Sequence, residues 1–422
     1  MNFTKMKSFL LVVTIFFIVL LSGCGRGEAI DVAEQYITTI DQINIPDEVK
    51  VIGMGEATHG NREFQELKRD VFEVLVKNEN FRVFVLEGDF GAGQHINQFI
   101  LNGNGTAEEA VNALDYPIYY TKQMIELVQW MHDYNKTVNE DRKVYFYGND
   151  MQRYDYSKKG VLDYYKVVNA ESLKTYSKQL EHVSNESMRE LTSEQLRKTN
   201  ETIESILLDL ESNKMSYEEL SSTESYLFAL QNAEVMKQRT NLFLNDGDYT
   251  KLRDRYLSEN LQWIVEHEAA RGNDKVFVTG HNGHIEKTSA SLAGYKSMGN
   301  YLEEIYGEQY FAIGTDFIKS EFQAKNGSSG ERKNYTLENH NKLVDAFREV
   351  ESNIFYVDFE NASQSVELLD IISSEVKMAN IGDEFRSWYK FIKTFYTIEM
   401  VPNEAYDSVI IVKTATPTNV IE

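Results

Sequence analysis

The sequence predicts an α/β fold in three layers: a mainly parallel sheet flanked by helices, with a helical-bundle insertion and a smaller C-terminal α+β lobe. Three observations predict this fold. Short apolar runs rich in β-branched and aromatic residues recur along the chain, as buried strands do. Amphipathic helical segments separate these runs, an alternation typical of a parallel sheet covered on both faces. Finally, residues 156–245 contain no proline and only one glycine, Gly160, which favours a purely helical insertion.

The periodicity of apolar residues places each element. Strands are expected at residues 49–54, 81–86, 143–147, 275–279, 310–315, 353–359 and 408–412. Helices are expected at 30–43, 91–100, 121–138, 158–183, 193–213, 216–244, 251–270 and 301–306. Two further helices are expected to begin at residues 61 and 106. The chain then divides into a leader (1–23), a first part of the α/β core (24–155), the helical insertion (156–246), a second part of the core (247–319) and the small lobe (320–422).

Four of the expected strands end in ionisable side chains. These side chains are Glu56 and His59 after the first strand, Glu87 and Asp89 after the second, Asp150 after the third, and His281 and His284 after the fourth. In open α/β sheets, ligands bind in the crevice beyond the carboxyl ends of the strands. Ordinary turn residues could account for one such strand end, but four of them favour a single polar site.

The charge of the chain excludes one class of partner. With 43 Lys and Arg against 66 Asp and Glu, the net charge of the 422 residues is −23. Binding to a nucleic-acid backbone requires clustered basic residues, so no nucleic-acid partner is expected. The apolar content of 42% is sufficient for a packed core.

The N-terminus has the pattern of an export signal. Lys5 and Lys7 precede an apolar run over residues 9–21, which is too short for a comfortable membrane span. The run leads into Leu21-Ser22-Gly23-Cys24, which resembles the lipobox of bacterial lipoproteins. We therefore expect Cys24 to be lipidated and the mature chain to be an extracytoplasmic lipoprotein anchored in the membrane; the alternative is a buried cysteine in an uncleaved anchor. Cys24 is the only cysteine, so disulfides and thiolate nucleophiles are excluded.

Glu56 and His59 together have the chemistry of a general base. A neutral imidazole accepts a proton from water, and a neighbouring carboxylate holds its other nitrogen in the required tautomer. Such a base activates water to attack an ester or lactone, with a gain of about 10²–10⁴ in rate. The sequence contains no Gly-x-Ser-x-Gly elbow, Walker loop, dinucleotide fingerprint or His-Glu-x-x-His motif.

Several motifs together resemble the erythromycin esterase family. They are Gly55-Glu56-Ala57-Thr58-His59-Gly60, Leu86-Glu87-Gly88-Asp89, Gly148-Asn149-Asp150, Arg253-Asp254-Arg255-Tyr256, Gly280-His281-Asn282-Gly283-His284 and Gly314-Thr315-Asp316-Phe317, spread over residues 49–317. The resemblance implies hydrolysis of a macrolactone ester by water, without a cofactor, which would confer resistance to macrolide antibiotics. It also implies that His59 is the general base and Glu56 its partner, and that Glu87, His281 and His284 line the pocket while Asp150 supports it.

One position departs from the family pattern. Where the family has a basic residue, often arginine, nine positions after the histidine, this chain has Lys68, followed by Arg69. Lysine lacks the fork of arginine, so the part that Lys68 or Arg69 takes in substrate binding stays open. Asp89 is equally interpretable as a helix N-cap, and Arg253 as a partner in a structural ion pair.

Two alternatives use the same residues differently. His59, His281 and His284, with Glu56 or Glu87, could hold a divalent metal such as zinc, whose bound water becomes the nucleophile. The chain could also be a surface-anchored binding protein, or a factor that modifies envelope polysaccharides, on an esterase-like scaffold. The expected partners are a small ester or lactone, with a macrolide as the first candidate, and the membrane through Cys24.

Overall fold

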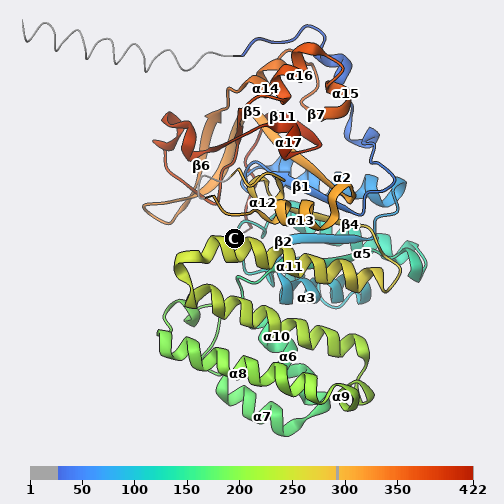
Figure 1. The fold of residues 1–422 in the computed structure, drawn as a ribbon, viewed down its shortest axis with the longest axis vertical. Coiled ribbons are helices and arrows are strands. Elements are labelled where there is room, and N and C mark those ends of the chain that lie inside the picture. The colour runs from blue at the N-terminus through green and yellow to red at the C-terminus, as the bar shows by residue number, and fades with distance from the viewer. Residues whose placement is uncertain (1–26, 291–293, 422) are drawn as a thin grey trace, which may run out of the picture.

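The computed structural model describes residues 27–290 and 294–421 (Figure 1). The expected export signal, with Cys24 and the apolar run before it, lies outside the described residues. Within the described ranges, none of the helices is both long and apolar enough to cross a bilayer.

The centre of the molecule is a mainly parallel sheet with the strand order β3-β2-β4-β1-β5-β11-β7, in which only β7 runs antiparallel to its neighbour. β6 and β9 pair with the far half of the long strand β5, and β8 and β10 form a separate antiparallel pair. The strands are β1 (Val51–Glu56), β2 (Val83–Asp89), β3 (Tyr145–Asp150), β4 (Val276–His281), β5 (Tyr310–Asn326), β6 (Arg332–Glu338), β7 (Ile354–Asp358), β8 (Val376–Ala379), β9 (Glu384–Phe385), β10 (Thr397–Met400) and β11 (Ser408–Ala415).

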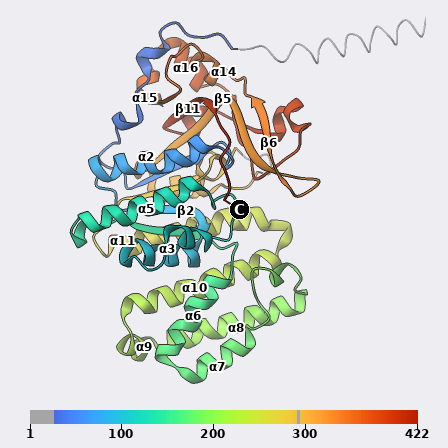
Figure 2. The ribbon, with the colours of Figure 1, turned by 180° about the vertical axis from the view of Figure 1, so that it is seen from behind.

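Helices cover both faces of this sheet, which confirms the expected α/β class. The helices are α2 (Arg62–Asn78), α3 (Phe90–Asn102), α4 (Ala107–Asn112), α5 (Lys122–Thr137), α6 (Asp155–Val168), α7 (Ala170–Gln179), α8 (Ser193–Ser212), α9 (Lys214–Leu220), α10 (Thr223–Leu244), α11 (Tyr249–Ala269), α12 (Asn282–Ile285), α13 (Met298–Tyr306), α14 (Lys342–Ala346), α15 (Phe359–Ala362), α16 (Val366–Ile372) and α17 (Pro402–Ala405). Figures 1 and 2 show the sheet and the helices that cover it from opposite sides.

Successive side chains of each strand point to opposite faces of the sheet and pack into two separate cores. Phe84 of β2 packs with α2, α4 and α5 on one face. Its neighbours Val83 and Val85 pack with α11 and α13 on the other face. Successive side chains of a strand point to opposite faces, and because both faces are covered, the strands consist of apolar residues without a polar face.

Helices α6–α10 form the helical body expected for the insertion. They stack beyond α3 and α11 at one end of the molecule (Figures 1 and 2). This body has an apolar core of its own, which includes Tyr165, Ile203, Leu210 and Met236. The longest of its helices, α10, also packs on α11 and so joins the body to the sheet layer.

The C-terminal segment differs from the expectation. Residues 320–422 were expected to form a smaller lobe, but β11 and β7 from this segment extend the main sheet: Ile410 of β11 pairs with Thr315 of β5 and with Tyr356 of β7. The reason is that β5 continues to Asn326 and offers its edge to strands that come later in the chain.

The helix expected at 30–43 is also wrong. This segment contains only two 3₁₀ turns, at Ala33–Tyr36 and Ile40–Gln42. Between them Thr38 forms an antiparallel bridge with Tyr356 of β7. Residues 37–40 are Ile-Thr-Thr-Ile, and such β-branched residues favour this extended pairing over a helix.

A close backbone contact fixes the turn after β1. The carbonyl oxygen of Gly60 accepts hydrogen bonds from the backbone N–H groups of Gln323 (3.1 Å) and Thr418 (2.9 Å). A Cβ atom at Gly60 would overlap the carbonyl oxygen of Gln323. Only glycine therefore lets β5 and the C-terminal segment approach the turn that carries His59.

We predict that Gly60→Ala lowers the free energy of unfolding by about 1–3 kcal/mol, because the added methyl group forces two backbone segments apart. Equilibrium urea unfolding measures this change. Gly382→Ala is the matched control, since a Cβ there meets nothing within 4 Å. Equal stability of the two variants would contradict the proposed contact.

Candidate active site

The pairing of the central strands places their polar C-terminal residues next to one another. Glu56, the last residue of β1, pairs directly with His281, the last residue of β4. On the other side of β4, β2 ends with Glu87, Gly88 and Asp89, and Asp89 pairs with Asp150 at the end of β3. Four parallel strands thus finish at one edge of the sheet, where their polar side chains lie side by side.

Glu56 and His59 form a buried pair. Nδ1 of His59 lies 2.6 Å from Oε1 of Glu56. Glu56 is 1% exposed and His59 is 8% exposed. The amide of Gln65, on the first turn of α2, donates hydrogen bonds to Glu56 Oε2 (3.1 Å) and to the backbone carbonyl of His59 (3.0 Å). Both members of the pair are thereby held in one orientation.

Lys68 keeps Glu56 of this pair ionised. Its Nζ lies 2.9 Å from Oε2 of Glu56 and 2.9 Å from Oε1 of Gln65, and the side chain is 1% exposed. Burial alone would raise the pKa of Glu56, but the charge of Lys68 and the hydrogen bonds from His59 and Lys68 outweigh burial and lower that pKa. Glu56 therefore stays a carboxylate and fixes the tautomer of His59.

A second polar cluster surrounds the guanidinium of Arg253, near the start of α11. Its Nη2 donates to Glu87 Oε1 and to Asp150 Oδ2, each at 2.6 Å. His284 of α12 completes the cluster, since its Nε2 lies 3.4 Å from Glu87 Oε1 and its Nδ1 lies 2.6 Å from Asp254 Oδ1. Two cationic groups thus face three carboxylates.

The electrostatics of this cluster follow from burial and charge. Burial raises the pKa of Glu87, but His284 and Arg253 lower it far more, so Glu87 is ionised. Burial lowers the pKa of His284, whereas the carboxylates of Asp254 and Glu87 raise it to about 8 despite the neighbouring Arg253. The two carboxylates therefore favour the imidazolium form of His284, against Arg253 Nη1 at 3.0 Å from its Nε2.

His281 connects the two clusters. Its ring centroid lies 5.1 Å from that of His59, and its backbone N–H donates to Glu87 Oε2 at 2.7 Å. Burial and the adjacent His59 lower the pKa of His281 to about 3, so this imidazole is neutral. Its Nε2 lies 3.0 Å from the carbonyl oxygen of Ile381, which makes Nε2 the protonated nitrogen.

Tyr119 closes the site beside His59. The two rings meet edge to face with centroids 6.1 Å apart, and Nζ of Lys68 lies 5.0 Å from the Tyr119 ring centroid. The phenol is buried, and its hydroxyl has no hydrogen-bond partner among the described residues. A buried hydroxyl without a partner is costly, so it is a group that a bound substrate can satisfy.

Of the expected site residues, Arg69 lies elsewhere, and Asp89 lies at the strand ends but binds the start of a helix. Arg69 is on the outer side of α2, where it pairs with Asp70 (3.1 Å) and Glu73 (3.6 Å). Asp89 caps α3, because its Oδ2 accepts from the backbone N–H of Ala92 at 2.7 Å. Burial and the nearby charge of Asp150 raise the pKa of Asp89 to about 7. The structure thus places Lys68, but not Arg69, at the strand ends and supports the N-cap interpretation of Asp89.

The side chains named in the metal alternative already bond protein groups. His59 and His284 each direct Nδ1 at a carboxylate, and His281 directs Nε2 at a backbone carbonyl. The guanidinium of Arg253 lies between the carboxylates, where a second cation would be repelled. Among residues 27–290 and 294–421, no three His, Cys, Asp or Glu side chains are grouped so that they could hold a metal.

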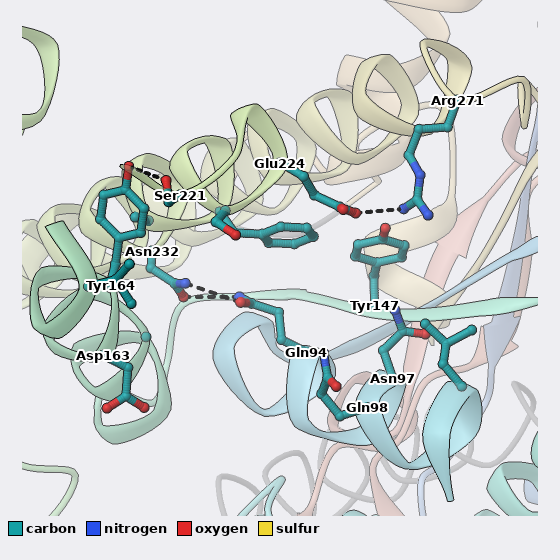
Figure 3. Close-up of a pocket in the computed structure, with 16 residues that line it drawn as sticks. Gln94, Asn97, Gln98, Tyr147, Asp163, Tyr164, Ser221, Glu224, Asn232 and Arg271 are labelled. Atoms are coloured by element: carbon teal, nitrogen blue, oxygen red, sulfur yellow. Dashed lines mark hydrogen bonds and ion pairs between the residues drawn. The ribbon is translucent and has the colours of Figure 1, made fainter. Parts of the chain in front are cut away.

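A cavity of about 720 Å³ lies apart from these residues, between α3, α6 and α10. Its lining side chains bond one another: Gln94 with Asn232, Tyr164 with Ser221, and Glu224 with Arg271 (Figure 3). None of the strand-end residues lines it. The cavity is therefore separate from the candidate active site.

The sequence did not single out Gln65, Asp254 or Tyr119. Gln65 could have been found, because it lies three residues before Lys68 and so shares its helix face. Asp254 belongs to the Arg253-Asp254-Arg255-Tyr256 motif, but the neighbouring sequence does not indicate that it bonds His284, thirty residues away. Tyr119 lies in the segment between α4 and α5, and its place beside His59 depends on tertiary packing.

Comparisons with known proteins identify the family and the fold. The family model described as erythromycin esterase matches residues 76–415. Erythromycin esterase type II of Escherichia coli is 25% identical over 293 residues, which cover 63% of this chain and 68% of that protein. Three solved structures have the same fold.

The first is a Bacillus cereus protein, 24% identical, with a TM-score of 0.78 over 92% of this chain and 97% of that one. The second is a succinoglycan biosynthesis protein, 20% identical, with a TM-score of 0.76 over 92% and 97% of the two chains. The third is a mutant of the erythromycin esterase EreC in its open conformation, 16% identical, with a TM-score of 0.67 over 89% and 93%.

The two histidines of the fourth strand end should titrate far apart. We predict an imidazole pKa of about 8 for His284 and of about 3 for His281 in the folded protein. Since the pKa of His284 is raised above its ordinary value of 6.5, its stabilising contribution is complete below pH 6.5 and is lost as the pH rises through about 8.

Imidazole NMR of the ¹⁵N-labelled protein measures both values. Asp254→Asn should lower the pKa of His284 because it removes the carboxylate next to Nδ1. Titration of both histidines near their ordinary pKa would contradict these two environments.

Proposed function

The chain belongs to the erythromycin esterase family, a family of esterase-type hydrolases, and on that premise we propose that it cleaves carboxylic esters or lactones with water as the nucleophile and His59 as the general base. The observation that carries the proposal is the 2.6 Å contact between His59 Nδ1 and Glu56 Oε1. This contact occupies one ring nitrogen, so Nε2 is the nitrogen that takes a proton from water.

The neighbouring groups would assist the attack. As water adds to the substrate carbonyl, negative charge develops on the carbonyl oxygen, and a preorganised donor stabilises it. The unpartnered hydroxyl of Tyr119 lies beside His59 and can donate to this oxygen. Lys68 is bound to Glu56 and Gln65, so we assign it to the support of the general base instead.

The second cluster would serve the leaving group. His284 is an imidazolium with a pKa of about 8, so it can give a proton to the departing alkoxide at neutral pH. Glu87 and Asp254 hold its ring in place. His281 stays neutral between His59 and Glu87 and separates the base from the acid. The base and the acid are then two different histidines at the same edge of the sheet.

A macrolide is the first substrate to test, since the Escherichia coli relative is an erythromycin esterase. We further propose that the chain acts outside the cytoplasm, held at the membrane by a lipid on Cys24. There it would meet its ester or lactone substrate at the cell surface.

We predict that His59→Asn lowers the rate of hydrolysis by about 10²–10⁴, because asparagine keeps the polarity of the position but cannot take a proton from water at neutral pH. The measurement is mass spectrometry of macrolides and simple esters, in which hydrolysis adds one water to a lactone. His95→Asn is the matched control, since His95 is exposed on α3.

The same assay separates the competing functions. Activity that survives exhaustive chelation supports the metal-independent reaction, and activity that is lost and then restored by zinc would support a metallohydrolase. Absence of turnover on every macrolide, simple ester and acylated polysaccharide fragment would contradict the proposal and favour a binding protein.

A further inference from the structure

The segment between β9 and β10 has an unusual surface. Residues 386–396, which we call the aromatic-basic loop, form two 3₁₀ turns at Tyr389–Phe391 and Lys393–Phe395. Phe391 is 78% exposed, and Trp388, Ile392 and Phe395 are 45%, 45% and 44% exposed. In the described part of the chain, the exposed tryptophan and phenylalanine side chains all belong to this loop. Such clustering of apolar surface marks an interaction site.

The charge of the loop is opposite to that of the protein. Residues 385–398 contain Arg386, Lys390 and Lys393 and no acidic residue, in a chain of net charge −23. Arg386 and Lys393 donate to backbone carbonyls of Gly327 (2.8 Å) and His340 (2.6 Å), and no carboxylate of residues 27–290 or 294–421 pairs with either charge. Lys390 lies 5.2 Å from the ring centroid of Phe391.

The nearest acidic residues on the N-terminal side have partners of their own. Asp383 pairs with Arg332 at 2.6 Å, and Glu384 pairs with Lys325 at 3.3 Å. The loop therefore carries the exposed Lys390 and the half-buried Arg386 and Lys393 beside its exposed aromatic rings, and the adjoining carboxylates are already paired.

We propose that the aromatic-basic loop docks on the surface of an anionic lipid bilayer. Tryptophan and phenylalanine insert at the boundary between headgroups and acyl chains, and basic side chains pair with anionic headgroups. The loop combines both properties within eleven residues. Its positive charge matches an anionic membrane, whereas the rest of the acidic surface is repelled by one and so orients the protein.

The start of the described chain lies next to this surface. The backbone N–H of Gly27 donates to Asp345 at 2.6 Å, Asp345 lies 3.5 Å from His340, and the carbonyl of His340 accepts from Lys393 of the loop. Cys24 precedes Gly27 by three residues, which span at most about 11 Å. The described chain begins on the side of the molecule opposite α7–α9 (Figure 1), and a lipid on Cys24 would stay within this reach of the loop.

The proposed lipid on Cys24 and the aromatic-basic loop would bind the membrane together. A single weak membrane signal gives reversible binding, whereas two signals give stable attachment. The proposed lipid would hold the chain near the bilayer, and the loop would set its orientation. The docking function of the loop does not depend on lipidation and can be tested without it.

The test uses the chain from residue 24 onward with Cys24→Ser, which contains every element of the described fold and carries no lipid. Flotation with vesicles of phosphatidylglycerol and phosphatidylcholine should recover the protein, and pure phosphatidylcholine vesicles should recover less. Raised salt should weaken the binding, because the headgroup attraction is screened. Quenching of Trp388 by brominated lipid should accompany the binding.

The double variant Trp388→Ser/Phe391→Ser should bind at least about tenfold more weakly, because it removes the inserting rings, and Lys390→Glu should weaken binding to the anionic vesicles alone. Met215→Ser is the matched control, since Met215 is 86% exposed on the distant helix α9. No vesicle binding by the parent chain, or equal losses in the control and the double variant, would overturn the proposal.

The loop could instead bind the substrate, because Ile381, shortly before the loop, contacts His281. Hydrolysis of a soluble ester distinguishes the two. Docking predicts that the double variant keeps its rate on such a substrate while losing vesicle binding. Loss of hydrolysis with intact vesicle binding would assign the loop to the substrate and overturn the docking proposal. This outcome would leave His59 as the general base unaffected.

Discussion

The candidate active site depends on the contact between one buried lysine and one buried carboxylate. Glu56 is almost fully enclosed at the end of β1, and an enclosed carboxylate without compensation takes up a proton. Lys68 approaches it at 2.9 Å and keeps it ionised. Removal of one partner of such a pair typically costs about 3–5 kcal/mol, since the other charge is left buried. The orientation of His59 follows from this pair, because its Nδ1 is directed at the same carboxylate.

The protonation states of the other ionisable side chains at the strand ends depend on their surroundings. Two histidines of one short motif have opposite protonation states: His281 has a pKa of about 3 because it is enclosed beside His59, and His284 has a pKa of about 8 because it faces Asp254 and Glu87. Arg253 holds Glu87 and Asp150 at the same edge and prevents their mutual repulsion. A neutral and a cationic imidazole thus coexist within one site.

Much of this arrangement is readable in the sequence. Parallel strands end at one edge, so the apolar runs before Glu56, Glu87, Asp150 and His281 predict the gathering of those groups. The periodicity of α2 explains why Lys68 faces inward while Arg69, one residue later, does not. Partners supplied by distant segments could not be predicted: Tyr119 and Ile381 reach the site only through tertiary packing. The place of β11 in the main sheet was missed for the same reason, because a short apolar run does not reveal which strand it pairs with.

The kinetics of Glu56→Gln test the account most directly, on any ester that the wild-type protein hydrolyses. Glutamine keeps the shape of the side chain but cannot stabilise the imidazolium that forms as His59 takes a proton. The account predicts that kcat falls by about 10²–10⁴ while KM changes little, since the lost interaction strengthens only in the transition state. A kcat within about threefold of the wild-type value would lie far below the contribution of a general base and would contradict the role given to the Glu56–His59 pair.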